Sequence, residues 1–129
     1  MRTMGNNILI VDDDQMIIDF FSFILEMNGF KVHKASNAYE AMQILVTNRV
    51  DLCLSDIQMP KVDGYQLCKG IKEIYRDISV ILWTADYSGA AMRKAKASGA
   101  VDCLSKSTSP ESLMKKILEI LMPEQIAVV

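Results

Sequence analysis

Residues 51 to 64 read DLCLSDIQMPKVDG, an apolar stretch that ends on an acid and is followed by a loop. Leu52 to Leu54 are apolar without alternation, which is typical of a strand buried inside a parallel sheet. Parallel sheets carry their functional groups at the carboxyl ends of the strands, and Asp56 stands at such an end. A second apolar stretch, Ile8 to Val11, leads in the same way into aspartates at 12, 13 and 14. Two neighbouring strands would thus present carboxylates to one crevice, which we expect to hold a hard cation.

Outward from this stretch, the chain alternates apolar strands with helices. We expect strands at 8–11, 30–35, 52–56, 79–84 and 100–105, and helices at 15–28, 37–48, 64–75, 88–98 and from 110 onward. Asp14, Asn37 and Ser109 are placed to cap three of these helices. The alternation predicts one doubly wound α/β domain with a five-stranded parallel sheet. In the strand order 2-1-3-4-5, the first and third strands are neighbours where the winding reverses, and ligands bind at that point.

Composition limits the classes of function. The 129 residues are 50% hydrophobic and 23% charged, which suits one globular domain with a proper core. A net charge of -2 argues against nucleic-acid binding by this domain. The three cysteines are scattered among apolar residues, as expected for reduced thiols in a cytoplasmic protein. The chain carries neither a signal-peptide pattern nor a membrane-length apolar run, so we expect a soluble protein without a membrane partner.

The expected crevice collects groups suited to phosphoryl transfer. Asp12 and Asp13 follow the first strand, Asp56 ends the third, Thr84 ends the fourth and Lys106 follows the fifth. Carboxylates held together repel unless a cation neutralises them, and all-oxygen ligation favours magnesium, calcium or manganese, with magnesium first. A carboxylate can act as a nucleophile and carry a phosphoryl group. The ammonium and the hydroxyl would neutralise charge on that group.

Other acids and the one histidine have local explanations. Asp63 with Gly64 suits a turn, and Asp102 suits an exposed strand position. His33 lies on the second strand, far from the crevice, and is expected to be structural.

The segments ILIVDDD, LSDIQMPKVDG, WTA and SK, in this order and spacing, resemble the receiver domain of bacterial response regulators over about residues 6 to 122. The resemblance implies a flavodoxin-like fold in which Asp56 is the phosphoacceptor. It also implies that Mg²⁺ is bound directly by Asp13, Asp56 and the backbone carbonyl of Gln58, and by Asp12 through water. Thr84 and Lys106 would contact the phosphoryl oxygens.

The resemblance further implies a role in two-component signalling. A histidine kinase or a histidine phosphotransfer protein would supply the phosphoryl group, and the phosphorylated domain would act on a downstream protein target. The domain would not be an enzyme beyond its self-catalysed phosphoryl transfer and dephosphorylation. On the first helix, Gln15, Ile18 and Ser22 would meet the helices of the kinase.

Two positions depart from the family pattern. Cys103 stands where most receivers carry Tyr or Phe, so the usual aromatic switch is missing. Ser107 stands where a cis proline is common, so the peptide bond before it is either trans or a costly non-proline cis bond.

These departures leave open an interaction module of receiver type that no longer signals. A haloacid-dehalogenase-type phosphatase is another alternative, because Asp12 and Asp14 have the spacing of its motif. The position two residues after Asp14 is Met16, however, where that family has Thr or Val, and the chain is too short for a cap domain. A nucleotide-binding protein is disfavoured because no glycine-rich loop follows the first strand.

Overall fold

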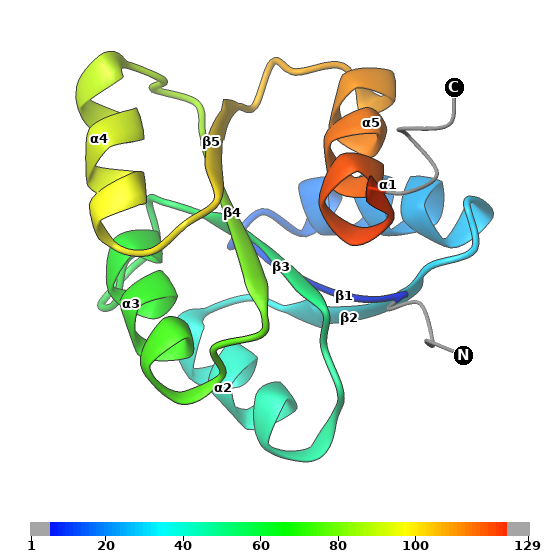
Figure 1. Cartoon of the computed structure of the whole chain (residues 1–129), viewed down its shortest axis with the longest axis horizontal. Coiled ribbons are helices and arrows are strands. Elements are labelled where there is room, and N and C mark those ends of the chain that lie inside the picture. The colour runs from blue at the N-terminus through cyan, green and yellow to red at the C-terminus, as the bar shows by residue number, and fades with distance from the viewer. Residues whose placement is uncertain (1–5, 124–129) are drawn as a thin grey trace.

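The computed structural model describes residues 6–123, which form five parallel strands and five helices in strict alternation (Figure 1). The strands are β1 (Asn7–Val11), β2 (Lys31–Ala35), β3 (Leu52–Asp56), β4 (Ser79–Thr84) and β5 (Asp102–Ser105). The helices are α1 (Gln15–Met27), α2 (Ala38–Thr47), α3 (Gly64–Ile74), α4 (Gly89–Ala97) and α5 (Pro110–Leu121). The sheet order is β2-β1-β3-β4-β5, so the predicted doubly wound α/β fold is confirmed.

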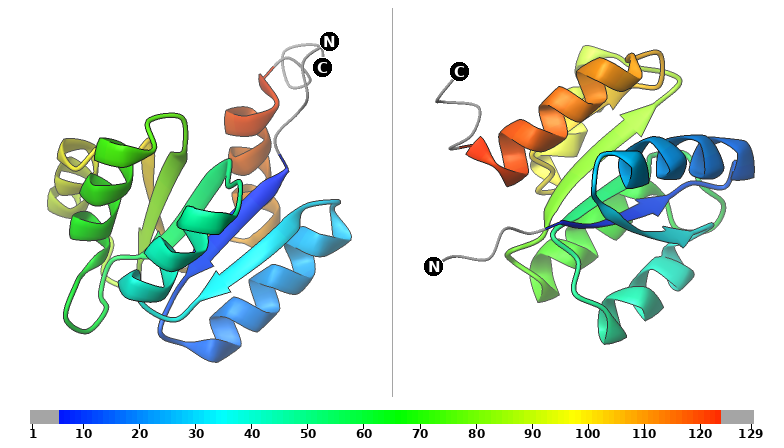
Figure 2. Two further views of the ribbon diagram at one scale, coloured as in Figure 1. Left: turned by 90° about the horizontal axis from the view of Figure 1, so that it is seen from below. Right: turned by 90° about the vertical axis from the view of Figure 1, so that its right-hand side faces the viewer.

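The helices lie in two layers on a twisted sheet (Figure 2). Helices α1 and α5 cover one face, where their apolar side chains pack on alternate strand residues such as Ile10, Leu54 and Trp83. Helices α2, α3 and α4 cover the other face and pack on residues such as Leu9 and Cys53. The central strands therefore bury side chains on both faces, which explains their continuous apolar sequence.

Capping residues mark where several of the helices begin. The Asp14 carboxylate accepts a hydrogen bond from the Met16 backbone N–H at 3.0 Å, and the side-chain oxygen of Asn37 accepts one from Glu40 at 2.8 Å. Ser109 caps α5 with Pro110 in its first turn, as predicted. The carboxylate of Glu40 accepts from Ser36 rather than from Asn37, so this cap is displaced by one residue from an ordinary capping box.

Helix α1 presents an apolar stripe to solvent as well as to the core. Met16, Phe20, Phe23 and Met27, spaced by four, three and four residues, are 81%, 53%, 62% and 72% exposed. Ile18 and Ser22 are buried against the sheet, so the expectation that they face a kinase is wrong. Because successive residues of a helix are 100° apart, the four exposed residues and the two buried ones lie on opposite sides of α1. The outward face is the stripe of Met16, Phe20, Phe23 and Met27.

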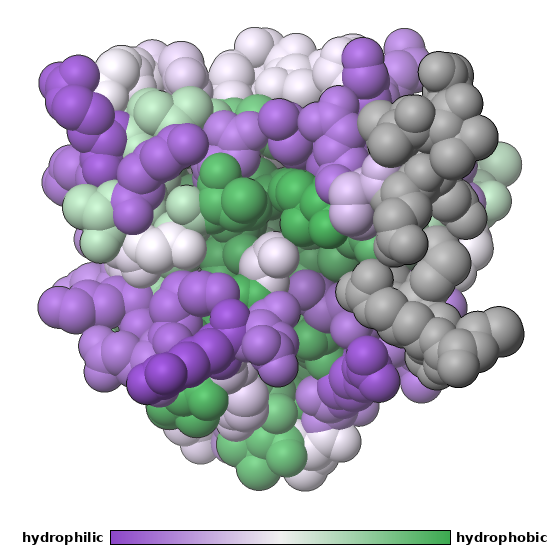
Figure 3. All heavy atoms as spheres, viewed as in Figure 1, coloured by the Kyte–Doolittle hydropathy of each residue, from purple (hydrophilic) through white to green (hydrophobic). Residues whose placement is uncertain are grey.

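The three cysteines lie in the interior of the fold. Cys53, Cys68 and Cys103 are buried and unbonded, as predicted. On the face shown in Figure 3, hydrophobic side chains gather near the centre and hydrophilic side chains surround them. Among residues 6–123, no helix has both the length and the apolar character that a membrane span requires.

Candidate functional site

Three carboxylates meet at the carboxyl edge of the sheet. Strands β1 and β3 pair in parallel, so the residues that follow them lie side by side. One carboxylate oxygen from each of Asp12, Asp13 and Asp56 lies within 4.8 Å of the other two. Asp12 and Asp56 are buried, whereas Asp13 is exposed at the mouth. The predicted cluster of acids is therefore present in the fold.

These carboxylates fit a hard divalent cation. Each offers oxygen ligands, and Mg²⁺ prefers oxygen. Asp12 Oδ1 accepts a hydrogen bond from the Asp14 backbone N–H at 2.9 Å. Asp12 Oδ2 is buried and lies 2.9 Å from the Lys106 ammonium. Carboxylate oxygens gathered at one place can bind such a cation directly or through water that the cation holds.

Lys106 follows β5 and reaches the cluster across the end of β4. Its backbone N–H donates to the Thr84 carbonyl at 2.9 Å, which fixes the residue just beyond the end of β5. Its ammonium lies 2.9 Å from Asp12 Oδ2 and 3.3 Å from Asp56 Oδ1. The expected ammonium group is thus placed at Asp56.

Electrostatics make the site receptive to positive charge. Burial, followed by the charge of Asp12, raises the pKa of Asp56 from 3.8 to about 6, although Lys106 and the Gln58 backbone N–H act in the opposite direction. Burial alone would lower the pKa of Lys106, but its hydrogen bonds and charge interactions with Asp12 and Asp56 outweigh this effect and raise it. One ammonium therefore does not fully compensate the carboxylates, and a divalent cation would stabilise their charged forms.

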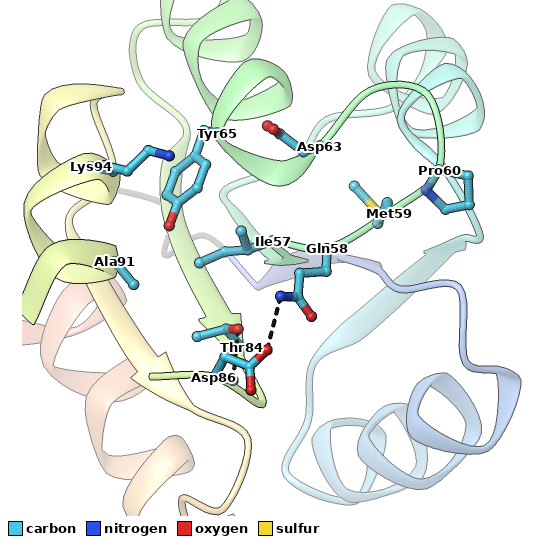
Figure 4. A pocket seen from close by; sticks show the side chains of 10 residues that line it. All are labelled: Ile57, Gln58, Met59, Pro60, Asp63, Tyr65, Thr84, Asp86, Ala91 and Lys94. Carbon is cyan, nitrogen blue, oxygen red and sulfur yellow. Dashed lines mark hydrogen bonds between the residues drawn. The ribbon is translucent and has the colours of Figure 1, made fainter. Parts of the chain in front are cut away.

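Thr84 and Gln58 lie beside the cluster, at the ends of β4 and β3. Thr84 is buried and its hydroxyl oxygen accepts a hydrogen bond from the Asp86 backbone N–H at 3.0 Å. The Gln58 backbone N–H donates to Asp56 Oδ1 at 3.3 Å, and its side-chain amide donates to Asp86 Oδ2 at 3.0 Å. Figure 4 shows this second bond crossing from the loop after β3 to the loop after β4. Hydrogen bonds therefore connect Asp56 with Thr84 through two loops.

A cavity of about 560 Å³ adjoins these loops, between α3 and α4. Thr84, Gln58 and Asp86 line one end, and Tyr65 and Lys94 line the other (Figure 4). The Lys94 ammonium lies 4.8 Å above the centroid of the Tyr65 ring. The cavity leaves space next to the Thr84 hydroxyl.

The loop after β3 is held close to the strand by Gly64. A β-carbon on Gly64 would lie 2.3 Å from the Asp56 carbonyl oxygen, so no larger residue fits without a shift of the backbone. The Gly64 N–H donates to the Ile57 carbonyl at 2.8 Å. Asp63 caps α3 in a reciprocal capping box with Gln66, so the prediction of a simple turn was incomplete. The Asp-Gly pair in the sequence signalled a turn but not this close approach.

The two family departures lie on β5 and just beyond it. Cys103 is buried in the core under α3 and α4. The Lys106–Ser107 peptide is trans, since residues 6–123 contain no cis peptide bond. The Ser107 hydroxyl lies 2.7 Å from that of Ser105, which keeps the turn after β5 compact.

Two features were not identified from the sequence. Asp102 was expected to be exposed, but it is only partly exposed and pairs with Lys116 of α5 at 3.1 Å. Trp83, the residue before Thr84, is fully buried and its ring lies beneath the Lys106 ammonium. Both contacts join residues from different elements, so local sequence patterns carried no signal for them.

Comparison with known proteins identifies the family. The family model for the response regulator receiver domain matches residues 8–118. The heme response regulator HssR of Staphylococcus saprophyticus is 35% identical over 113 residues, which are 88% of this chain and 50% of that protein. The alkaline phosphatase synthesis transcriptional regulatory protein PhoP of Bacillus subtilis is 30% identical over 124 residues, 96% of this chain and 52% of that protein. The chain thus spans about half the length of the curated relatives it matches.

A solved structure gives the same result. The CheY-like response regulator receiver domain protein of Methanospirillum hungatei has a TM-score of 0.87 and 29% sequence identity, and the match covers 95% of this chain and 98% of that one. The acidic cluster, the strand order and these matches agree with one another, and the chain belongs to the response regulator receiver domain family of two-component signalling proteins.

Proposed function

We propose that Asp56 accepts a phosphoryl group from a phosphohistidine on a histidine kinase or a histidine phosphotransfer protein. The observation that supports this role most strongly is the position of Asp56 at the end of β3, inside the carboxylate cluster and 3.3 Å from the Lys106 ammonium. Asp12 and Asp13 both follow β1, whereas Asp56 ends β3, the strand between β1 and β4. Only Asp56 combines this central position with the contact to Lys106.

In the proposed reaction, an Asp56 carboxylate oxygen attacks phosphorus. The new O–P bond forms as the P–N bond to the donor imidazole breaks, and the imidazole leaves with the electron pair and takes up a proton. Lys106 and the Thr84 hydroxyl would bind the phosphoryl oxygens, which carry the charge in the transition state. Water attack on phosphorus would later return Asp56 to its free carboxylate.

The metal would be Mg²⁺, held by Asp13, Asp56 and the Gln58 backbone carbonyl, with Asp12 acting through water. When bound, it supplies positive charge that neutralises the carboxylates and the incoming phosphoryl oxygens. The close grouping of the three carboxylates and the raised pKa of Asp56 both support a cation at this position.

The partner would dock on the stripe of α1. Met16, Phe20, Phe23 and Met27 form an exposed apolar face, and such a face suits helices of a partner protein. We propose this stripe in place of the buried Ile18 and Ser22. The phosphorylated domain would then act on a downstream protein target, in the cytoplasm and without binding nucleic acid itself.

Phosphoramidate, a small P–N phosphodonor, tests the proposal without the unidentified kinase. In the presence of Mg²⁺, intact mass spectrometry should show the addition of one phosphoryl group, and EDTA should prevent it. Asp56→Asn should remain unmodified. Modification of the Asp56→Asn protein, or equal modification of the natural protein with and without Mg²⁺, would refute the assignment.

A further inference from the structure

Trp83 lies beside the phosphorylation site, yet the chemistry described above does not use it. It immediately precedes Thr84 on β4 and pairs in register with Asp56 of β3. Its side chain is 0% exposed and lies in the core beneath α1 and α5. The Phe21 ring of α1 meets it edge to face, with centroids 4.9 Å apart.

The Trp83 ring lies under the Lys106 ammonium. The ammonium nitrogen is 5.9 Å from the ring centroid, within the distance at which a cation is attracted to an aromatic face. The same nitrogen is 2.9 Å from Asp12 and 3.3 Å from Asp56. The ammonium therefore has a ring and two carboxylates as neighbours.

The indole N–H of Trp83 gives a second reason to assign the ring a role. It is buried and has no hydrogen-bond acceptor within residues 6–123. A buried donor without an acceptor is destabilising, and an aliphatic side chain such as that of Ile81 on the same face would avoid it. The aromatic ring offers what an aliphatic side chain cannot, which is a face that attracts the Lys106 cation.

We infer that Trp83 is a positioning residue that holds the Lys106 ammonium at Asp56. The carboxylates that contact Lys106 are the groups proposed to bind Mg²⁺, so a bound cation would compete with the ammonium for them. The ring contains no metal ligand, and its attraction for the ammonium does not face this competition. Trp83 would thus keep Lys106 in place when the metal is bound, a role that rests on the proposed function of the site.

NMR of the unphosphorylated protein tests the contact itself. A proton above an aromatic ring shifts upfield, so the Lys106 side-chain methylene protons nearest the ammonium should be shifted and should lose this shift in Trp83→Leu. Phe21→Leu is the matched control, because it disturbs the same core cluster but removes no neighbour of Lys106. In that variant the shift should persist.

The rate of phosphorylation by phosphoramidate with Mg²⁺ tests the consequence. Trp83→Leu should slow it about three- to tenfold, the range expected for loss of one cation–aromatic contact. Trp83→Phe retains a ring and should recover most of the rate, and Mg²⁺ affinity measured by NMR titration should change less than about twofold in either variant. Thermal unfolding of each variant would show that the proteins compared are folded.

Three results would overturn the inference. They are Lys106 protons without an upfield shift in the natural protein, equal slowing by Phe21→Leu and Trp83→Leu, and failure of Trp83→Phe to restore the rate. If Asp56 itself were not phosphorylated, the proposed function would fail. The NMR shift would still decide whether the ring holds Lys106.

Discussion

Replacing Asp56 by Asn should stabilise the metal-free protein at neutral pH. Burial and the neighbouring Asp12 raise the pKa of Asp56 from 3.8 to about 6, so the folded state disfavours its charged form. Each pKa unit corresponds to about 1.4 kcal/mol, which gives an upper value of about 3 kcal/mol. Solvent at the mouth of the crevice, where Asp13 is exposed, screens part of this effect and reduces the figure to about 1–2 kcal/mol.

The sign of the pH dependence follows from the raised pKa. Above about pH 6 the carboxylate is charged in both the folded and unfolded states, and the destabilisation is fully present. As the pH falls below 6 the folded state takes up the proton first, and the destabilisation disappears by about pH 4. Asn carries no charge at any pH. The gain in the free energy of unfolding should therefore be largest above pH 6 and vanish near pH 4.

Urea unfolding in EDTA at about pH 7.5 and at about pH 4 would measure this gain. Asp14→Asn is the control, because Asn caps a helix about as well as Asp and should change stability by less than about 0.5 kcal/mol. Excess Mg²⁺ at the higher pH should stabilise the natural protein and reduce or reverse the difference from Asp56→Asn. A variant no more stable than the natural protein at pH 7.5 would refute the electrostatic description of the site.

Three further predictions concern the metal, the partner and the switch. Asp13→Ala should weaken Mg²⁺ binding far more than Asp14→Ala in an NMR titration, because the first removes a carboxylate of the cluster and the second only a helix cap; equal losses would exclude Asp13 as a ligand. Phe20→Ser should slow phosphotransfer from the cognate kinase but not from phosphoramidate, whereas Val46→Ser, which changes an exposed apolar residue of α2, should affect neither; slowing with both donors would indicate a structural defect. Because Cys103 lacks a ring, beryllofluoride should shift amide signals strongly in the site loops and weakly in β5 and α5, and Cys103→Tyr should extend the response; large shifts in β5 of the natural protein would contradict this account.

Several parts of the fold could be predicted because their signals are local. Asp14 and Ser109 occupy cap positions that a few neighbouring residues define, and both cap as expected. The acids at 12, 13 and 56 follow apolar strands, and a parallel sheet brings strand ends to one edge whatever the details of packing. Sequence pattern and elementary geometry were sufficient for these features.

The remaining features depend on contacts between distant segments. Ile18 and Ser22 are buried residues of α1, and only the position of the sheet decides which side of this helix is buried. Asp102 looked exposed because its partner, Lys116, lies on another element. The place of Trp83 under Lys106 likewise depends on the pairing of β4 with β5. No local pattern encodes such pairings.

The role of Asp56 is best tested by locating the phosphoryl group on the chain. After reaction with phosphoramidate and Mg²⁺, borohydride reduces an aspartyl phosphate to homoserine, and peptide mass spectrometry then identifies the residue converted. We expect conversion at Asp56 and no conversion in the Asp56→Asn protein. Homoserine at Asp12 or Asp13, or no conversion at any residue, would contradict it.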